Sequence, residues 1–298
     1  MNFDKLSIPL AFLSVIIIWS TTPLAIQWSS EGAPMTSVFY RMLIGAVFCV
    51  VAMQLTQGMP KLSKNVIRIY LVGALSIYLG STLFYYSAQL IPSGWVAVIF
   101  GLSPLITGFF SAIVEPEAKL TRARLLGLAL GLSGLALVFS AGLSFETASI
   151  IGIAYSLLAV IISSATSVLT RQLVKDQEIT GLQITSGSLL AALPFFIITV
   201  LYVSPGFEAE FSNKAIYGMI YLGLLGSGVG FTLYYFLLKH VSATKISLVT
   251  LITPITALTL GAWLNNEPIV ARVYYGAVLV CIGLILYEFK PKLGLRHL

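Results

Sequence analysis

The chain has 298 residues, of which 58% are hydrophobic and only 9% are Asp, Glu, Lys or Arg. Soluble chains carry roughly 25% charged residues, so this composition excludes a water-soluble globular protein. The formal charge of +6 does not indicate a nucleic-acid partner, because the Lys and Arg residues lie in short loops and not on one face with aromatic residues between them.

Apolar runs bounded by turn residues or charges predict an all-α polytopic membrane protein with ten spans. Each run can cross a hydrocarbon layer of roughly 30 Å at about 1.5 Å per residue. The first five cover residues 6–28, 35–56, 66–89, 93–114 and 123–141, and the second five cover 149–170, 181–203, 215–238, 243–264 and 271–289. The first run lacks a small-residue cleavage pattern, so we expect a retained span and not a signal peptide.

The cations predict the orientation of these spans. With the N-terminus in the cytoplasm, 14 of the 17 Lys and Arg residues fall on the cytoplasmic side, and only Arg41, Lys214 and Arg272 fall on the far side. Cytoplasmic loops of membrane proteins carry such an excess. We therefore expect both termini in the cytoplasm.

The sequence also matches itself at an offset of 150 residues. The matched pairs include Gly73 and Gly223, Gly80 and Gly230, Thr82 and Thr232, Tyr85 and Tyr235, Pro104 and Pro254, Glu117 and Glu267, and Arg122 and Arg272. Chance matches in apolar sequence would favour Leu, Ile and Val. We expect two copies, residues 1–142 and 143–298, and because five spans is an odd number the second copy must be inverted. Inverted repeats are typical of secondary transporters with a site near the bilayer midplane.

Polar residues inside the spans predict where a substrate site lies. Tyr78, Thr82 and Tyr85 share one face of the third span at helical spacing, whereas Gly73, Ser76 and Gly80 form a small-residue face that we interpret as helix packing. Hydroxyl groups facing lipid would be unsatisfied, so they either line a cavity or form interhelical hydrogen bonds. We expect a cavity lined by Trp19, Thr22, Tyr78, Thr82, Tyr85, Ser103, Thr107, Ser163, Thr166, Thr232, Tyr235 and Thr253, with helix kinks or gating at Pro23, Pro104 and Pro254.

Charged residues are scarce inside the predicted spans. Arg41 is the only candidate for a charge within one, and it either reaches the interface, pairs with Glu31 or guides a substrate carboxylate. No Asp, Glu, His or Lys lies deep enough to relay protons, which predicts facilitated efflux or coupling without a titratable side chain. The absence of a positioned acid, base or nucleophile also argues against a membrane enzyme. We therefore expect no catalytic residue.

Cysteine and glycine patterns complete the prediction. Cys49 and Cys281 lack the spacing of a disulfide framework or a zinc site, so we expect no metal and no cofactor. Glycines in the fifth span of each half permit close helix approach, which we assign to packing within one chain. A monomer is expected, with a dimer left open, and the remaining partners are a small-molecule substrate and the lipid bilayer.

Several of these features resemble a known family. The TTPLA segment at residues 21–25, Arg41 early in the second span, the paired prolines and the similar elements at 115–117 and 266–268 resemble the EamA branch of the drug/metabolite transporter (DMT) superfamily. Within that branch, the pattern is most similar to YddG-type exporters of aromatic and other neutral amino acids.

The resemblance implies a basket-like bundle whose central cavity is formed by the first, third and fourth helices of each half. It further implies export across the bacterial inner membrane by alternating access. Export of another metabolite or a drug cation, and a channel-like facilitator, are the alternatives.

Overall fold

The computed structural model describes residues 8–30, 33–58, 60, 62–114, 121–140, 147–204, 210–241, 246, 249–266 and 271–288. Every regular element within these ranges is a helix, which confirms the predicted all-α class for this part of the chain. In the first half the helices are α1 (Ile8–Ser29), α2 (Pro34–Thr56), α3 (Lys64–Leu75), η2 (Ser76–Gly80), α4 (Ser81–Leu90), α5 (Ser93–Phe100), α6 (Ser103–Val114) and α7 (Arg122–Ser140).

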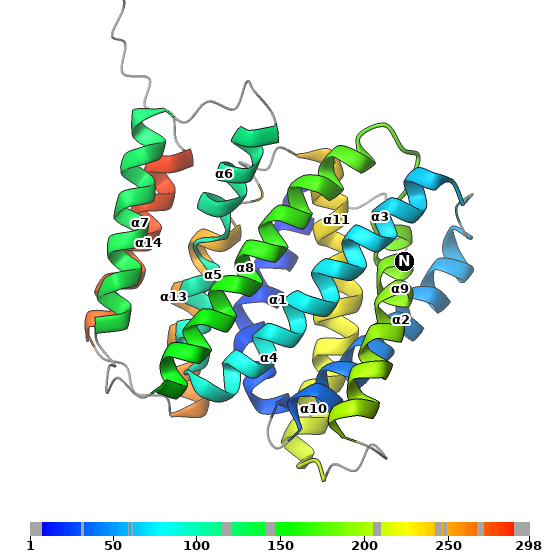
Figure 1. The fold of residues 1–298 in the computed structure, drawn as a ribbon, viewed down its shortest axis with the longest axis horizontal. Helices are drawn as coiled ribbons and strands as arrows, with labels where there is room; N and C mark the ends of the chain where they lie inside the picture. Colours follow the sequence, from blue (N-terminus) through cyan, green and yellow to red (C-terminus); the bar gives the residue numbers. More distant parts are fainter. Residues whose placement is uncertain are drawn as a thin grey trace, which may run out of the picture.

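The second half follows the same plan (Figure 1). Its helices are α8 (Thr147–Val174), α9 (Gly181–Val203), α10 (Asn213–Tyr221), η3 (Leu222–Gly230), α11 (Phe231–His240), α13 (Val249–Asn265) and α14 (Ala271–Glu288). Among the described residues, seven continuous helical runs are long and apolar enough to cross a membrane, and α14 adds a shorter apolar stretch, Ala271–Leu286. The protein is thus a multi-pass membrane protein, whereas ten crossings remain a prediction.

Three of the predicted spans are interrupted. The third and eighth contain the π-helical segments η2 and η3, in which the wider turn changes the direction of the following side chains. The fourth was predicted to kink at Pro104, but the structure breaks it into α5 and α6 at Gly101 and Leu102. Pro104 is the second residue of α6, where its missing N–H costs no helical hydrogen bond. By contrast, Pro23 and Pro254 lie inside α1 and α13.

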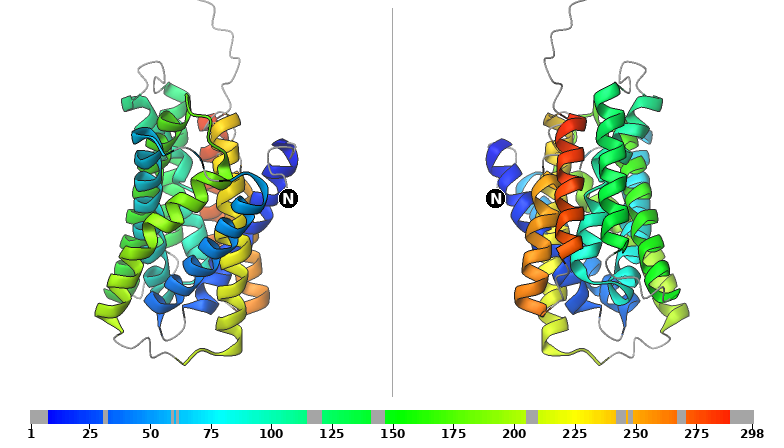
Figure 2. Two further views of the ribbon diagram at one scale, coloured as in Figure 1. Left: turned by 90° about the vertical axis from the view of Figure 1, so that its right-hand side faces the viewer. Right: turned by 90° about the vertical axis from the view of Figure 1, so that its left-hand side faces the viewer.

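The helices form one bundle with a packed pair at each edge. In Figure 1, α7 and α14 lie together at the left, α2 and α9 at the right, and Figure 2 shows α14 alongside α7 from the side. Between them, α1 packs on α13 as α8 packs on α6, and α3 with η2 packs on α9 as α10 with η3 packs on α2. The 150-residue offset exchanges the members of these pairs. Two similar halves related by a two-fold axis would give this pattern, and their inversion stays a prediction.

Buried apolar side chains form two clusters. The first, which includes Tyr85 and Phe196, draws mainly on α1, α2, α3, α4, α9 and α11. The second, which includes Ile99 and Val280, draws mainly on α5, α6, α7 and α14. The helices α8 and α13 contribute to both clusters. The interior is therefore two packed cores that meet along a seam.

The edge pair α7 and α14 is joined through glycines. A Cβ atom added at Gly134 would lie 2.6 Å from the Gly276 carbonyl oxygen, and one added at Gly283 would lie 2.6 Å from the Gly127 carbonyl oxygen. These backbones approach more closely than any side chain would allow. The predicted glycine packing within one chain is confirmed for this pair.

Candidate substrate cavity

A cavity of about 380 Å³ lies within the bundle. This volume is within the range of sites for small molecules, roughly 300 to 1,000 Å³. Its lining comes from α1, η2 and α4, α5 and α6, α8, η3 and α11, and α13, with single residues from α2 and α7. These are the first, third and fourth helices of each predicted half, which are the helices that the family resemblance implies.

One side of the cavity is aromatic. We call Trp19, Phe84, Phe100 and Tyr234 the aromatic wall, because their rings form a chain across four helices. Ring centres lie 4.9 Å apart between Phe84 and Phe100, 6.3 Å between Phe100 and Trp19, and 5.2 Å between Trp19 and Tyr234. Such contacts fix the rings, so the wall presents a preformed apolar surface to a ligand.

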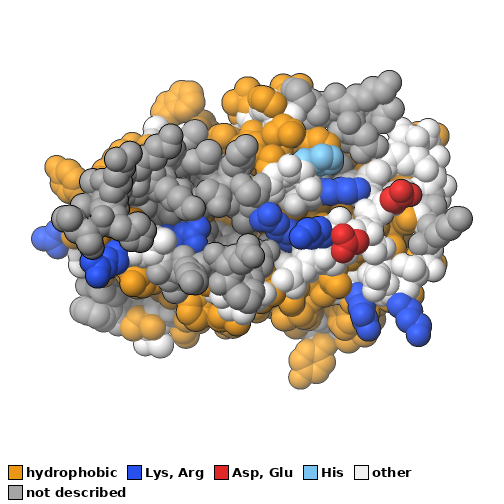
Figure 3. Space-filling view, turned by 90° about the horizontal axis from the view of Figure 1, so that it is seen from above, with side chains coloured by type: hydrophobic (Ala, Val, Ile, Leu, Met, Phe, Trp, Pro, Cys, Tyr) orange, Lys and Arg blue, Asp and Glu red, His pale blue; other side chains and the backbone are white. Residues whose placement is uncertain are grey.

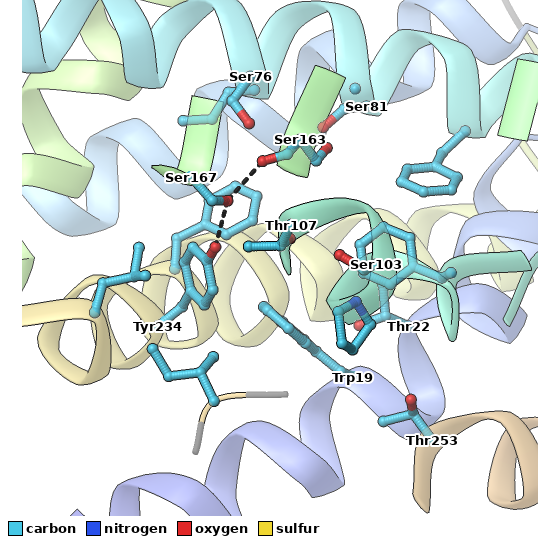
Figure 4. A pocket seen from close by; sticks show the side chains of 18 of the residues that line it. Trp19, Thr22, Ser76, Ser81, Ser103, Thr107, Ser163, Ser167, Tyr234 and Thr253 are labelled. Atoms are coloured by element: carbon cyan, nitrogen blue, oxygen red, sulfur yellow. Dashed lines mark hydrogen bonds between the residues drawn. The ribbon is translucent and has the colours of Figure 1, made fainter. Parts of the chain in front are cut away.

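Hydroxyl groups line the rest of the central part, as Figure 4 shows. The members of this hydroxyl wall are Ser76, Ser81, Ser103, Thr107, Ser163 and Ser167. Ser167 donates to the Ser163 carbonyl oxygen at 2.6 Å and shares a second hydrogen bond of 2.6 Å with the Tyr234 hydroxyl. This pair joins the two walls. The cavity can thus hold an apolar group on one side and polar groups on the other.

Seven of the twelve side chains predicted to line a cavity lie at this one. They are Trp19, Thr22, Ser103, Thr107, Ser163, Tyr235 and Thr253, and Pro23 and Pro104 lie beside them. Pro254 packs instead on the break between α5 and α6, where a Cβ at Gly101 would lie 3.0 Å from its ring. Whether the seven bind a substrate remains a prediction.

The other five predicted residues, Tyr78, Thr82, Tyr85, Thr166 and Thr232, are not among the side chains that line this cavity. Tyr78 faces α9, where its hydroxyl lies 2.5 Å from that of Thr199. Tyr85 is fully buried and accepts a hydrogen bond of 3.0 Å from Ser29. Within the described part of the chain, the Thr82 hydroxyl is buried without a partner.

Thr166 and Thr232 bond to carbonyl oxygens one turn earlier in their own helices, at 2.8 Å and 2.7 Å. Hydroxyl groups satisfied in this way can be tolerated without a wet cavity.

The π-helical segment η2 interrupts the helix on which Tyr78, Thr82 and Tyr85 were predicted to share one face. Tyr78 lies inside η2 and Tyr85 lies after it, so straight α-helical spacing does not place them on one face. Ser76 and Gly80, which we had assigned to helix packing, line the cavity instead. Sequence reasoning also missed Phe84, Phe100 and Tyr234 as wall residues. Tyr234 is the neighbour of the predicted Tyr235, but the helical spacing that selects Thr232 and Tyr235 does not include it.

Three arginines line the cavity, two of them at one end. Arg124 and Arg171 lie near the end of the bundle where α7 begins and α8 finishes, which we call the Arg171 end. Figure 3 views this end and shows several Lys and Arg side chains beside few acidic ones. Among the described residues, no acidic side chain lines the cavity. The electrostatic character of its described lining is therefore positive.

The third arginine, Arg41, lies deeper and is only 4% exposed. Its Nε donates a hydrogen bond of 3.0 Å to the Ser227 hydroxyl, and its guanidinium carbon lies 5.8 Å from the centre of the Tyr85 ring. Its predicted pairing partner, Glu31, lies outside the described residues. The structure thus places a buried cation at the side of the cavity.

The opposite end of the bundle is closed by a polar network that we call the latch. Asn265 donates to the Gln27 side chain at 3.0 Å and accepts from the Trp28 indole at 3.1 Å and from Lys214 at 3.2 Å. Lys214 also lies 4.8 Å from the centre of the Trp28 ring. The latch ties α13 to α1 and α10 beyond the end of the cavity, whereas the lining extends to Arg124 and Arg171 at the other end.

The described residues hold no group of three His, Cys, Asp or Glu side chains that could bind a metal ion. Cys49 and Cys281 are buried in different helices.

Comparisons with known proteins agree with this architecture. The model of the EamA-like transporter family matches residues 6–140 and again residues 150–289. A solved crystal structure with 18% sequence identity superposes with a TM-score of 0.71 and covers 96% of both chains, so the two share a fold.

Curated relatives also match along most of their length. The uncharacterized transporter YoaV of Bacillus subtilis is 24% identical over 94% of this chain and 96% of its own. The uncharacterized inner membrane transporter YedA of Escherichia coli K12 is 25% identical over 98% and 96%. The protein PecM of Dickeya dadantii is 22% identical over 91% and 89%.

Proposed function

Because the chain belongs to the EamA-like transporter family, we propose that this membrane transporter exports aromatic or other neutral amino acids across the bacterial inner membrane by alternating access. The observation that carries the proposal is the cavity itself, whose lining combines the rings of the aromatic wall with the hydroxyl groups of the hydroxyl wall. An amino acid with an apolar side chain has the same division between an apolar and a polar part. Sites of this kind use apolar surface for affinity and a few polar groups for orientation.

The positions of the latch and the arginines support the direction. The excess of predicted cytoplasmic cations supports an orientation in which the Arg171 end faces the cytoplasm. The cavity extends to that end and is separated from the other by the latch, as expected for a transporter ready to load from inside the cell. A drug cation is disfavoured, because Arg41 lines the cavity as a buried cation and would repel it.

Counterflow in proteoliposomes tests the function. Vesicles holding purified protein are loaded with one unlabelled L-amino acid, and accumulation of the labelled form is measured across a panel of aromatic and aliphatic amino acids. We expect saturable, stereoselective exchange. Conduction without saturation would support a channel-like facilitator, and exchange of organic cations alone would refute the proposed substrate class.

Replacing Trp19 should weaken binding of aromatic substrates. Trp19 is the central ring of the aromatic wall, so Trp19→Ala should raise the half-saturating concentration roughly 10-fold. Concentration-dependent counterflow measures it. Trp263→Ala is the matched control, because Trp263 is 78% exposed on α13 and should leave the value unchanged. Equal effects of both substitutions would show that Trp19 does not contribute specifically to substrate binding.

Transport should respond little to a proton gradient. The described acidic side chains Asp176, Glu178 and Glu210 are exposed near helix ends, and none lines the cavity. Facilitated efflux is therefore expected, with initial rates that change less than about twofold when a pH gradient is imposed at constant internal pH. A fluorescent pH indicator inside the vesicles provides the check, and substrate-linked proton movement would contradict this expectation.

A further inference from the structure

We propose that Arg41 binds the carboxylate of the transported solute, so that the cavity selects solutes with an anionic group beside an apolar body. The inference rests on the proposed function and adds to it the residue and the chemical group that set selectivity. Three observations carry it: the burial of the charge, the partners of its guanidinium and its place at the cavity.

Burying the charge of Arg41 inside a membrane span costs free energy. Its side chain is 4% exposed inside a helix that the membrane surrounds, and charges in such positions are retained for pairing or for function. No carboxylate among the described residues lies within ion-pair distance of it. The described partners, the Ser227 hydroxyl and the ring and hydroxyl of Tyr85, are neutral. A bound carboxylate would supply the missing counter-charge.

The guanidinium also has donors left for a ligand. A guanidinium carries five N–H groups, of which the one on Nε bonds to Ser227 and another to the Tyr85 hydroxyl, so three remain. One terminal nitrogen lies next to Gly226, where an added Cβ would be 3.5 Å away. Both Gly226 and Arg41 line the cavity, so the missing side chain at Gly226 leaves room beside this nitrogen. Arginine binds carboxylates through two parallel hydrogen bonds in such positions.

Neighbouring residues give the bound solute an orientation. Arg41 shares the cavity with Thr22 and Ile26 of α1, whereas Trp19, about one turn earlier in α1, belongs to the aromatic wall. A carboxylate at Arg41 would place the apolar body of the solute toward the aromatic wall. The hydroxyl wall and its backbone carbonyl oxygens would then receive the amino group.

Matched acids and amides test whether Arg41 anchors the carboxylate of the solute. L-phenylalanine and L-phenylalaninamide, and the corresponding leucine pair, differ at the carboxylate and both carry an amino group. Binding to the purified full-length protein is measured by calorimetry. We expect the wild type to prefer the acid by roughly 10- to 100-fold. Arg41→Gln should reduce this preference to about 3-fold or less. Arg41→Lys should give an intermediate value, because lysine keeps the positive charge but lacks the planar guanidinium that forms two parallel hydrogen bonds.

Two further variants separate the anchor from a general effect on folding. Gly226→Ala keeps the charge, and its added methyl would lie 3.5 Å from the Arg41 nitrogen and 3.3 Å from the end of the Leu222 side chain, which has to shift by a few tenths of an ångström. It should therefore fold and lower acid binding while sparing the amide. Arg272→Gln removes the same charge from an exposed position and should change neither acid binding nor amide binding. Undiminished acid preference in Arg41→Gln would overturn the anchor while leaving amino-acid transport intact.

Thermal stability provides a readout that needs no substrate. If Arg41 serves a ligand, Arg41→Gln removes a buried charge that has no counter-charge among the described residues, and it should leave the melting temperature equal or higher. A lowered melting temperature that Glu31→Gln restores would show an internal ion pair and overturn the anchor. Absence of counterflow for every amino acid would instead refute the proposed function, and the stability result would still decide the role of Arg41.

Discussion

Gly134→Val should separate α7 from α14 and lower the melting temperature by roughly 2 to 12 °C. The new side chain would meet the Gly276 carbonyl oxygen at 2.6 Å and the Val280 backbone nitrogen at 2.8 Å, and backbone atoms cannot turn aside as a flexible side chain can. Overpacking costs about 1 to 3 kcal/mol or more, and about 1 kcal/mol shifts the melting temperature of a chain of moderate size by about 2 to 4 °C.

The measurement is a thiol-reactive or light-scattering melt of the purified protein in detergent. Ser133→Val is the matched control, because Ser133 precedes Gly134 on the same helix but is exposed. Gly276→Val should reproduce the effect, and the double variant should lose less than the two losses added together, because both changes disrupt the same contact. A stable Gly134→Val protein would mean that α7 and α14 tolerate a wider separation.

Asn265→Ala should open the latch end and admit reagents to the cavity from that side. The substitution removes hydrogen bonds to Gln27, Trp28 and Lys214, each worth about 0.5 to 1.5 kcal/mol. If the latch is broken in the alternative conformation, its loss shifts the population toward that conformation on the order of 10- to 1,000-fold. The latch end should face the outside of the cell under the predicted orientation.

Accessibility of a single cysteine measures this shift. Ile26 lines the cavity next to Gln27, so Ile26→Cys reports whether a membrane-impermeant thiol reagent enters. Both native cysteines are buried and provide little background. Thr259→Ala removes polar contacts from an exposed position of the same helix, including one of 3.0 Å to Tyr274, and should leave labelling unchanged. Labelling of Ile26→Cys that is equally fast with and without Asn265 would contradict a gating role.

The sequence predicts the helices better than the directions of their side chains. Predicted and observed boundaries coincide at 93–114 and 181–203, even though the first run is divided at Gly101. Apolar runs are reliable because a helix in lipid must satisfy its own backbone and end near the bilayer surface. The glycine contacts of α7 and α14 were predictable for a related reason, since small residues at regular spacing have few roles other than close packing.

The candidate site was predictable only in part. Ser103 and Thr107 were found because α6 is a regular helix and its polar residues share a face. Tyr78 was misplaced because a π-helical turn leaves no signature in hydropathy. The surroundings of Arg41 depend on Ser227, 186 residues away, and on Tyr85. Such contacts are set by how the helices pack, which one sequence without relatives does not reveal.

The two apolar clusters do not correspond to the two halves of the sequence. The first cluster joins α1 to α4 with α9 and α11, and the second joins α5 to α7 with α14, so each contains helices from both halves. Tightly packed cores resist deformation and move as rigid units. A turnover that tilts these units against each other therefore uses parts built from both copies, and neither copy produced alone would contain a complete moving part.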